Sequence, residues 1–208
     1  LEFVHYRTLV NSLASGVAKS VYVDASGVLW IGNHGGGLNK LLVSDIGEFR
    51  QDNDIFVHYQ TSFKDPQGLG RDIIWTIYED HGGGLWLGTH GRGLGKFDRE
   101  SETFTHYLRD PDNPRSLSHN VVFSIYEDPS GVLWIGTGGG GLNRFDREHG
   151  TFVHYKQRDG LPDDVVYCIL GDKQGDLWLS TNKGLSRFDP QSETFRNYGM
   201  SDGLQGYE

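Results

Sequence analysis

A motif of the form Asp-x-x-Gly-x-x-Trp occurs four times in this chain, with the same internal spacing each time. The copies are Asp24–Trp30, Asp80–Trp86, Asp128–Trp134 and Asp172–Trp178. A run of β-branched and aromatic residues precedes each copy, and a Gly-rich stretch, a Gly-Leu pair and a segment ending in Tyr follow it. Self-similarity at a fixed period indicates a repeat architecture.

Each repeat predicts four short antiparallel strands rather than helices. Short β-branched and aromatic runs bounded by Gly, Asp, Asn and Pro are typical of strands, and no stretch has apolar residues at helical spacing over three turns. The repeat is about as long as one blade of a β-propeller. We therefore predict an all-β fold, a β-propeller of about four blades with four antiparallel strands each. The runs expected to form the inner strands are Val17–Tyr22, Ile73–Tyr78, Val121–Tyr126 and Val165–Leu170, and those expected to form the outer strands are Phe56–Tyr59, Phe104–Tyr107, Phe152–Tyr155 and Phe195–Tyr198.

The strand count predicts an arc rather than a closed ring. The blades span about 13–59, 69–107, 117–155 and 161–198, an orphan outer strand occupies 1–8, and 199–208 looks like the lead-in to a further blade. A small closed ring would need further strands to pair with the orphan, although four blades lie within the propeller range. We therefore expect 1–208 to be a segment of a larger propeller, which exposes two blade faces. The first residue is Leu1 rather than Met, so we also expect a processed or excised chain.

The repeated residues are interpreted as scaffold. The Asp and the Gly suit the turn between the first two strands of a blade, and the Trp is large enough to fill the gap between blades. Ligand stacking is the alternative for the Trp. Trp75 takes the place that Phe123, Tyr167 and Lys19 occupy in the other copies, and it is also interpreted as packing. Cys168 stands where the other copies have Ser or Thr, which predicts a small buried side chain and not a nucleophile.

Composition excludes several classes of protein. The net charge of −9 argues against nonspecific nucleic-acid binding, which needs a basic face to displace counterions. No apolar run is long enough to cross a membrane, so we expect no membrane contact by this segment, and we expect no signal peptide within it. With one cysteine there is no intrachain disulfide. We expect no metal and no cofactor, because the histidines of the outer strands fall one per blade, too far apart to share an ion: His5, His58, His106 and His154.

The loops at one face of the propeller hold the candidate ligand contacts. Loops that vary on a rigid scaffold are where binding is usually placed, whereas the Gly-rich runs are interpreted as turns, since no helix follows them as a P-loop requires. No catalytic set could be assembled. The candidate ligand-binding residues mix amide, hydroxyl, imidazole and charged groups, which suits sugar hydroxyls; they are Asn33, His34, Arg71, Asp72, Thr89, His90, Arg92, His119, Asn120, Asp163, Asp164, Asn182 and Lys183.

The full pattern around each motif resembles the two-component regulator propeller repeat. Its best copies are Asn120–Thr137 and Asp72–Thr89, while Asp164–Thr181 departs from it at Gly171 and Ser180. The resemblance covers nearly the whole chain. A single Asp-x-x-Gly-x-x-Trp would be weak, but four copies in register are specific.

The resemblance implies a place in a larger receptor. Such repeats build seven-bladed propellers in the periplasmic or extracellular sensor region of membrane-bound hybrid histidine kinases. The resemblance therefore implies that this chain is a noncatalytic sensor segment of a receptor that acts in signal transduction through a phosphorelay. It also implies that the segment binds an oligosaccharide or mediates homodimer contacts of the parent receptor. Two alternatives stay open: a propeller enzyme such as a polysaccharide lyase or a streptogramin-type lyase, and a purely structural protein-interaction propeller.

Overall fold

The computed structural model describes residues 13, 16–42, 55–59, 69 and 73–204. In this part of the chain sixteen strands form four antiparallel sheets, each with its strands in sequence order. We call the sheets blades 1 to 4. Blade 1 contains β1 (Ala18–Val23), β2 (Leu29–Asn33), β3 (Leu38–Leu42) and β4 (Ile55–Tyr59), and blade 2 contains β5 (Ile74–Glu79), β6 (Leu85–Thr89), β7 (Leu94–Asp98) and β8 (Thr103–Tyr107). Blade 3 contains β9 (Val122–Glu127), β10 (Leu133–Thr137), β11 (Leu142–Asp146) and β12 (Thr151–Tyr155), and blade 4 contains β13 (Val166–Gly171), β14 (Leu177–Thr181), β15 (Gly184–Asp189) and β16 (Thr194–Tyr198).

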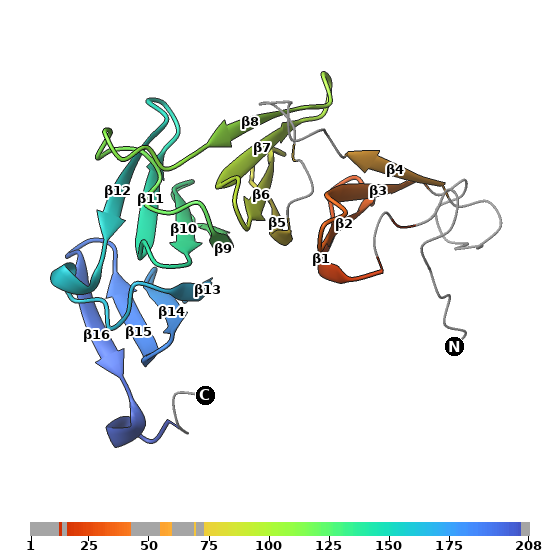
Figure 1. Ribbon diagram of the computed structural model, residues 1–208. Helices are drawn as coiled ribbons and strands as arrows, with labels where there is room; N and C mark the ends of the chain where they lie inside the picture. Colours follow the sequence, from red (N-terminus) through yellow and green to blue (C-terminus); the bar gives the residue numbers. More distant parts are fainter. Residues whose placement is uncertain (1–12, 14–15, 43–54, 60–68, 70–72, 205–208) are drawn as a thin grey trace.

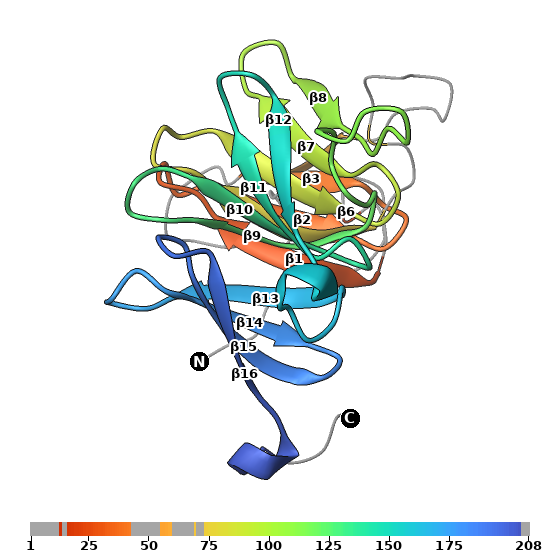
Figure 2. The ribbon, with the colours of Figure 1, turned by 90° about the vertical axis from the view of Figure 1, so that its left-hand side faces the viewer.

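The four blades form an open arc (Figure 1). The first strand of each blade lies on the concave side, where β1, β5, β9 and β13 are successive neighbours. The fourth strands lie on the outside, and Figure 2 shows the neighbouring sheets stacked and twisted relative to one another. The prediction of an all-β propeller segment is confirmed. The orphan strand predicted at 1–8 lies outside the described residues.

Helical structure is limited to two short 3-10 turns in the described part of the chain. They are η1 (Gln157–Asp159) and η2 (Met200–Asp202). No helix in these ranges has the length and apolar character that crossing a membrane would need. The four inner strands each begin one residue later than the apolar run that predicted them.

The Asp of the repeated motif organises its turn, as predicted. Asp24 Oδ1 accepts hydrogen bonds from the N–H groups of Ser26 and Val28, at 3.0 and 2.9 Å. Gly27 has a φ of 84°, which an L side chain rarely adopts. A second contact was not predicted: Oδ2 accepts a hydrogen bond from Trp30 Nε1 at 2.8 Å. The same Asp–Trp bond occurs in all four copies, at 2.7 to 2.9 Å, so the motif is one hydrogen-bonded unit.

Burial and hydrogen bonding act in opposite directions on these carboxyl groups. Burial alone would raise the pKa of Asp24, but hydrogen bonds from Ser26, Trp30 and Arg99 hold the pKa well below its usual range. The net pKa shift is also downward for the Asp residues of the other three motifs. The carboxylates are therefore ionised parts of the scaffold at neutral pH.

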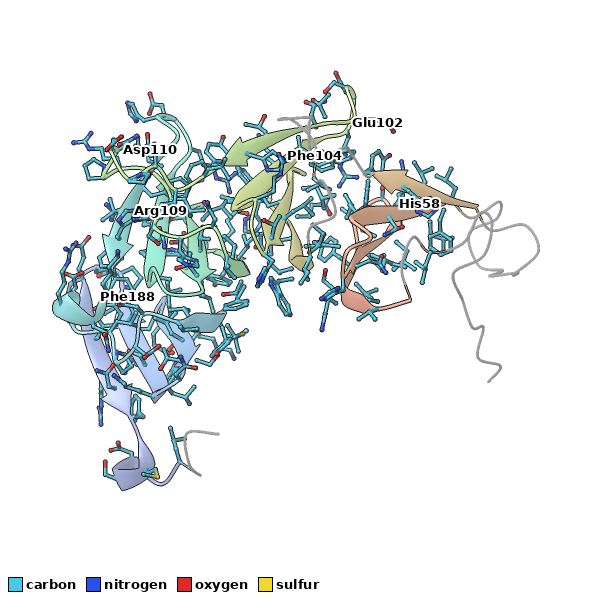
Figure 3. All side chains as sticks on the ribbon, in the orientation of Figure 1. His58, Glu102, Phe104, Arg109, Asp110 and Phe188 are labelled. Carbon is cyan, nitrogen blue, oxygen red and sulfur yellow. The ribbon has the colours of Figure 1, made fainter. Side chains whose placement is uncertain are left out.

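Three of the four repeat tryptophans, Trp30, Trp86 and Trp134, pack between blades as predicted. Trp134 is 1% exposed, and its ring meets Phe188 of blade 4 edge-on at 5.5 Å between centroids. Figure 3 shows Phe188 on its strand of blade 4. Trp30 and Trp86 make the same contact with the next blade. Burying an aromatic side chain of this size contributes strongly to stability, so each junction has its own apolar core.

The two ends of the arc present apolar side chains to solvent, as expected for a propeller segment. Val21 of blade 1 and Leu170 of blade 4 are each 63% exposed. Trp178 stacks on Tyr198 of its own blade at 5.5 Å and is only partly buried. The prediction that Cys168 is buried is wrong, since it is exposed. Its counterpart Ser124 is buried within an internal blade, whereas Cys168 belongs to the last blade of the chain.

Candidate functional site

Each inner strand carries a β-bulge near its first residue, and the bulge defines a candidate site. In blade 2, Ile74 pairs with Thr89 and Thr76 pairs with Gly88, so Trp75 has no residue opposite it. The same interruption occurs in the other three blades. A bulge re-aims the extra side chain out of the regular alternation of the strand. The four extra residues, which we call the inner row, are Lys19, Trp75, Phe123 and Tyr167.

The members of the inner row contact one another from blade to blade. Lys19 Nζ lies 5.3 Å from the centroid of the Trp75 ring, a cation–π distance. The rings of Trp75 and Phe123 meet edge to face at 5.5 Å, and those of Phe123 and Tyr167 stack at 5.2 Å. Tyr167 is 48% exposed, and Trp75 and Phe123 are partly exposed. The inner row is thus a partly exposed surface that runs across the innermost strands. It consists of three aromatic rings and one ammonium group.

In blades 2 and 4 the loop between the second and third strands supplies a polar partner for the row. Trp75 Nε1 donates to His90 Nδ1 at 3.3 Å, and the Tyr167 hydroxyl donates to Asn182 Oδ1 at 2.8 Å. In blade 3 the equivalent loop residue is Gly138, where an added Cβ would lie 3.0 Å from the Phe123 ring. Loop and strand therefore present one aromatic and one polar group together in two of the blades.

Some of the candidate residues predicted from the sequence lie beside the inner row. His90 and Asn182 bond to it directly, as described above. Asn182 Nδ2 also donates to Asp163 Oδ1 at 3.1 Å, and Lys183 Nζ lies 4.0 Å from Asp163 Oδ2. These contacts join Tyr167, Asn182, Asp163 and Lys183 into one network. His34 is exposed at the same loop position in blade 1, where its N–H donates to the Val17 carbonyl at 2.9 Å.

Other candidates have structural contacts at the strand ends. Asn33 and Thr89 are fully buried. The Thr89 hydroxyl donates to the Gly93 carbonyl at 3.1 Å and accepts the Arg92 N–H at 2.8 Å. Asn33 Oδ1 accepts a hydrogen bond from the Asn39 amide. These contacts shape the loop rather than face a ligand.

The candidates that enter the inner strands hold the linkers between blades. His119 Nδ1 accepts the N–H of Val121 at 3.1 Å, and Asp163 Oδ1 accepts that of Val165 at 2.9 Å. Asn120 and Asp164 each accept an N–H from the preceding linker. The remaining candidates, Arg71 and Asp72, lie outside the described residues.

Sequence reasoning missed the inner row itself. Trp75 was assigned to packing, but it is partly exposed and belongs to none of the buried hydrophobic clusters. The physical reason is the bulge, which turns this position away from both packing faces of the strand. One signal was present: with the four copies in register, this single position holds Lys19, Trp75, Phe123 and Tyr167.

The arrangement suits binding through ring faces and hydrogen bonds. Within the described ranges, no three His, Cys, Asp or Glu side chains lie close enough together to hold a metal ion. The groups at the row are an indole, a phenyl ring, a phenol, an ammonium, an amide and an imidazole. Together they offer stacking surfaces next to donors and acceptors, which is the mixture found in small-molecule sites.

Comparison with known proteins gives consistent results. The family model of the two-component regulator propeller matches residues 63–91, 116–139 and 160–183. No curated protein sequence matches the chain.

Solved structures share the fold. The extracellular domain of BT4673 from B. thetaiotaomicron, described as a hybrid two-component system, has a TM-score of 0.75 and 26% identity, covering 91% of this chain and 26% of that one. The corresponding domain of BT3049 from the same organism has a TM-score of 0.61 and 24% identity, covering 87% of this chain and 30% of that one. Virginiamycin B lyase from Staphylococcus aureus has a TM-score of 0.62 at 17% identity, covering 88% of this chain and 55% of that one, which shows the fold alone. The chain spans about a quarter of the length of the BT4673 domain.

Proposed function

We propose that this chain, three segments of which match the family model of the two-component regulator propeller, is a noncatalytic, ligand-recognising propeller segment in the extracellular sensor region of a two-component receptor. The extracellular domains among the similar structures support this location. The ligand class we propose is an oligosaccharide. The observation that carries the proposal is the inner row, a partly open aromatic surface built from the same bulge in every blade.

The chemistry of the row favours a sugar. One face of a pyranose ring carries C–H groups that are apolar and slightly positive, and they complement the negative face of an aromatic ring. The hydroxyl groups at the rim of the sugar need donors and acceptors. His90 and Asn182 supply them next to Trp75 and Tyr167. A chain of sugar units laid across the row would meet a ring and a polar loop in turn.

Calorimetry on the 208-residue chain tests this proposal. The probes are cellohexaose, xylohexaose and trigalacturonate, titrated into the wild type and into Trp75→Ala and Tyr167→Ala. We expect saturable binding of at least one probe, weakened about tenfold or more by each variant through the loss of a stacking partner. Leu108→Ala is the control, because Leu108 is exposed in the linker after β8 and should leave binding unchanged.

Two outcomes would replace the proposal. If no probe binds, or the row variants bind as tightly as the wild type, the row is not a glycan site and a structural interaction propeller is favoured. If the bound oligosaccharide is cleaved in the same samples, seen as new reducing ends or unsaturated products, the segment is a propeller enzyme.

A further inference from the structure

A groove on the outside of blade 3 concentrates positive charge in an acidic protein. It has a volume of about 720 Å³, and its walls come from β11, β12, the turn before β10, and the linkers on either side of blade 3. Four of the chain's 19 Lys and Arg residues line it: Arg115, Arg144, Arg147 and Arg158. Because the chain as a whole has a net charge of −9, a groove lined by four arginines differs in charge from the rest of the protein.

Three of the four guanidinium groups keep donors available for a ligand. Arg147 is already committed, because its two terminal nitrogens contact Asp80 and Glu127 at 2.7 and 2.5 Å. Arg144 makes only a long contact of 3.4 Å with Glu193, and Arg158 makes one of 3.6 Å with its neighbour Asp159. No described residue pairs with the side chain of Arg115 in a hydrogen bond or an ion pair.

The one acidic side chain that lines the groove, Asp146, already has hydrogen-bond partners of its own. Asp146 Oδ2 lies 2.8 Å from His149 Nδ1, and Oδ1 accepts the backbone N–H groups of Glu148 and His149. The His149 imidazole is the main reason that the pKa of Asp146 is lowered. The carboxylate therefore has partners of its own and does not satisfy the arginines.

The position of Arg115 is fixed by the fold. The linker that carries it lies along β12, with the Arg115 carbonyl accepting the Phe152 N–H at 2.7 Å. His154 Nε2 lies 2.7 Å from the Ser116 carbonyl oxygen. Burial lowers the pKa of His154, so the neutral imidazole donates this hydrogen bond at neutral pH. Two bonds thus hold the linker on an outer strand and bring Arg115 to the groove.

We propose that this groove binds a small polyanionic ligand, one that carries two or more carboxylate, sulfate or phosphate groups. The planar guanidinium group presents a fork of donors that matches these oxyanions. Three such groups around one concave surface select for several oxyanions on one molecule rather than for a single ion. Val132 and Val153 add an apolar wall. The groove is lined by residues of β11 and β12, the outer strands of blade 3, whereas the inner row belongs to the first strands on the concave side of the arc. An experiment can therefore reject one of the two proposals without rejecting the other.

Citrate is the first probe, because its three carboxylates can reach several arginines within one groove. In calorimetry at low ionic strength we expect saturable one-to-one binding that weakens as salt is added. Arg144→Gln with Arg158→Gln should weaken it about tenfold or more, since each removes charge-assisted hydrogen bonds. The control pair Arg109→Gln with Lys173→Gln removes the same charge from exposed positions outside the groove, one of which Figure 3 shows on the linker before blade 3.

The outcomes separate the site from a general charge effect. The proposal holds if the groove pair loses citrate and the control pair changes the affinity less than about twofold. It is overturned if the wild type shows no saturable binding, or if both pairs weaken binding equally. Trigalacturonate against maltotriose then separates a sugar acid from a free organic acid: tighter binding of trigalacturonate than citrate, lost in the groove pair, identifies an acidic sugar as the source of the oxyanions.

Discussion

The junctions between blades 1 and 2 and between blades 2 and 3 contain an ionic clamp that the junction between blades 3 and 4 lacks. At the second junction Arg147 bridges Asp80 of blade 2 and Glu127 of blade 3, and Glu127 also accepts the His81 N–H at 2.7 Å. At the first junction Arg99, Asp24, Glu79 and the Ala25 N–H repeat this arrangement.

Three positions at which the repeats differ in sequence explain why the third junction has no clamp. Pro190 stands where the arginine would be, Gly171 replaces the glutamate, and Pro129, which has no N–H to donate, replaces the residue after the Asp. Tyr126 lies so close to Gly171 that an added Cβ would meet its hydroxyl. The clamp is therefore a unit that is present whole or absent whole. Without it, the third junction depends on its apolar contacts to a greater extent.

The largest effect is expected from Trp134→Ala at the unclamped junction. Trp134 is 1% exposed, and its removal should cost about 3–5 kcal/mol of unfolding free energy. Because repeats contact only their neighbours, the loss should appear as faster hydrogen exchange across β13–β16. Trp86→Ala removes a tryptophan that is equally buried, but at a clamped junction. Hydrogen exchange across blade 3 should therefore increase less in Trp86→Ala than exchange across blade 4 increases in Trp134→Ala. Equal loss of protection in both variants would contradict a role for the clamp, and an unchanged melting temperature would show that Trp134 is not core.

Arg147→Met should be next in size. It leaves Asp80 and Glu127, whose side chains are 4% and 3% exposed, without their cation. Breaking a buried ion pair costs about 3–5 kcal/mol, and solvent screening of an arginine that is one-third exposed lowers our expectation to about 2–3 kcal/mol. Urea unfolding measures it. Protection of blade 4 should not change, because its junction has no clamp.

Acid unfolding gives the same clamp a second test. Burial on its own raises the pKa of Asp80, but bonds from Trp86, Gly84 and Arg147 give a net pKa below the usual value. A depressed pKa contributes stability above the unfolded pKa of about 3.9 and loses it as the pH falls toward the folded pKa. Arg147→Met raises the folded pKa, so its acid midpoint should move to higher pH than that of the wild type. An unchanged midpoint would show that the guanidinium does not stabilise this carboxylate.

Gly136→Ala tests how closely the blades approach one another. An added Cβ would lie 2.8 Å from the Val166 carbonyl oxygen of blade 4, too close without a shift of the backbone. Overpacking of this kind costs about 2 kcal/mol, which thermal unfolding would detect. The fourth copy has Ser180 at this position, in the last blade of the chain, so Ser180→Ala should change the melting temperature much less. A neutral Gly136→Ala would mean that the junction tolerates wider spacing.

The sequence predicted the scaffold because its signal is periodic. Four motifs in register identified the blades, the turn role of Asp24 and the packing role of Trp134. The Asp24–Trp30 hydrogen bond was not predicted, because spacing alone does not show that a turn carboxylate reaches back to an indole. The clamp was missed for a different reason: Asp80, Glu127 and Arg147 are far apart in the sequence and meet only when two blades pack.

The candidate site was predicted in part. His90 and Asn182 follow from their loop position, which the register of the copies shows. Trp75 was misassigned because a β-bulge is a one-residue irregularity in strand pairing, and it leaves no mark on the pattern of apolar residues. The outer groove was missed because Arg115 and Arg144 come from a linker and a strand that only the fold brings together.

The smallest effect we predict compares a tyrosine hydroxyl at two junctions. Tyr155 donates to Glu193 of blade 4 at 2.7 Å, whereas Gly150 takes the place of that glutamate next to Tyr107. Glu193 has a φ of 55°, a conformation that L residues rarely adopt, and the hydrogen bond offsets part of its strain. Tyr155→Phe should therefore lose about 1 kcal/mol, since the carboxylate partner is half exposed, while Tyr107→Phe should lose almost nothing. Urea unfolding of the two variants measures this difference. Equal losses of unfolding free energy would mean that the hydroxyl groups contribute through burial alone and that the hydrogen bond does not stabilise the unclamped junction.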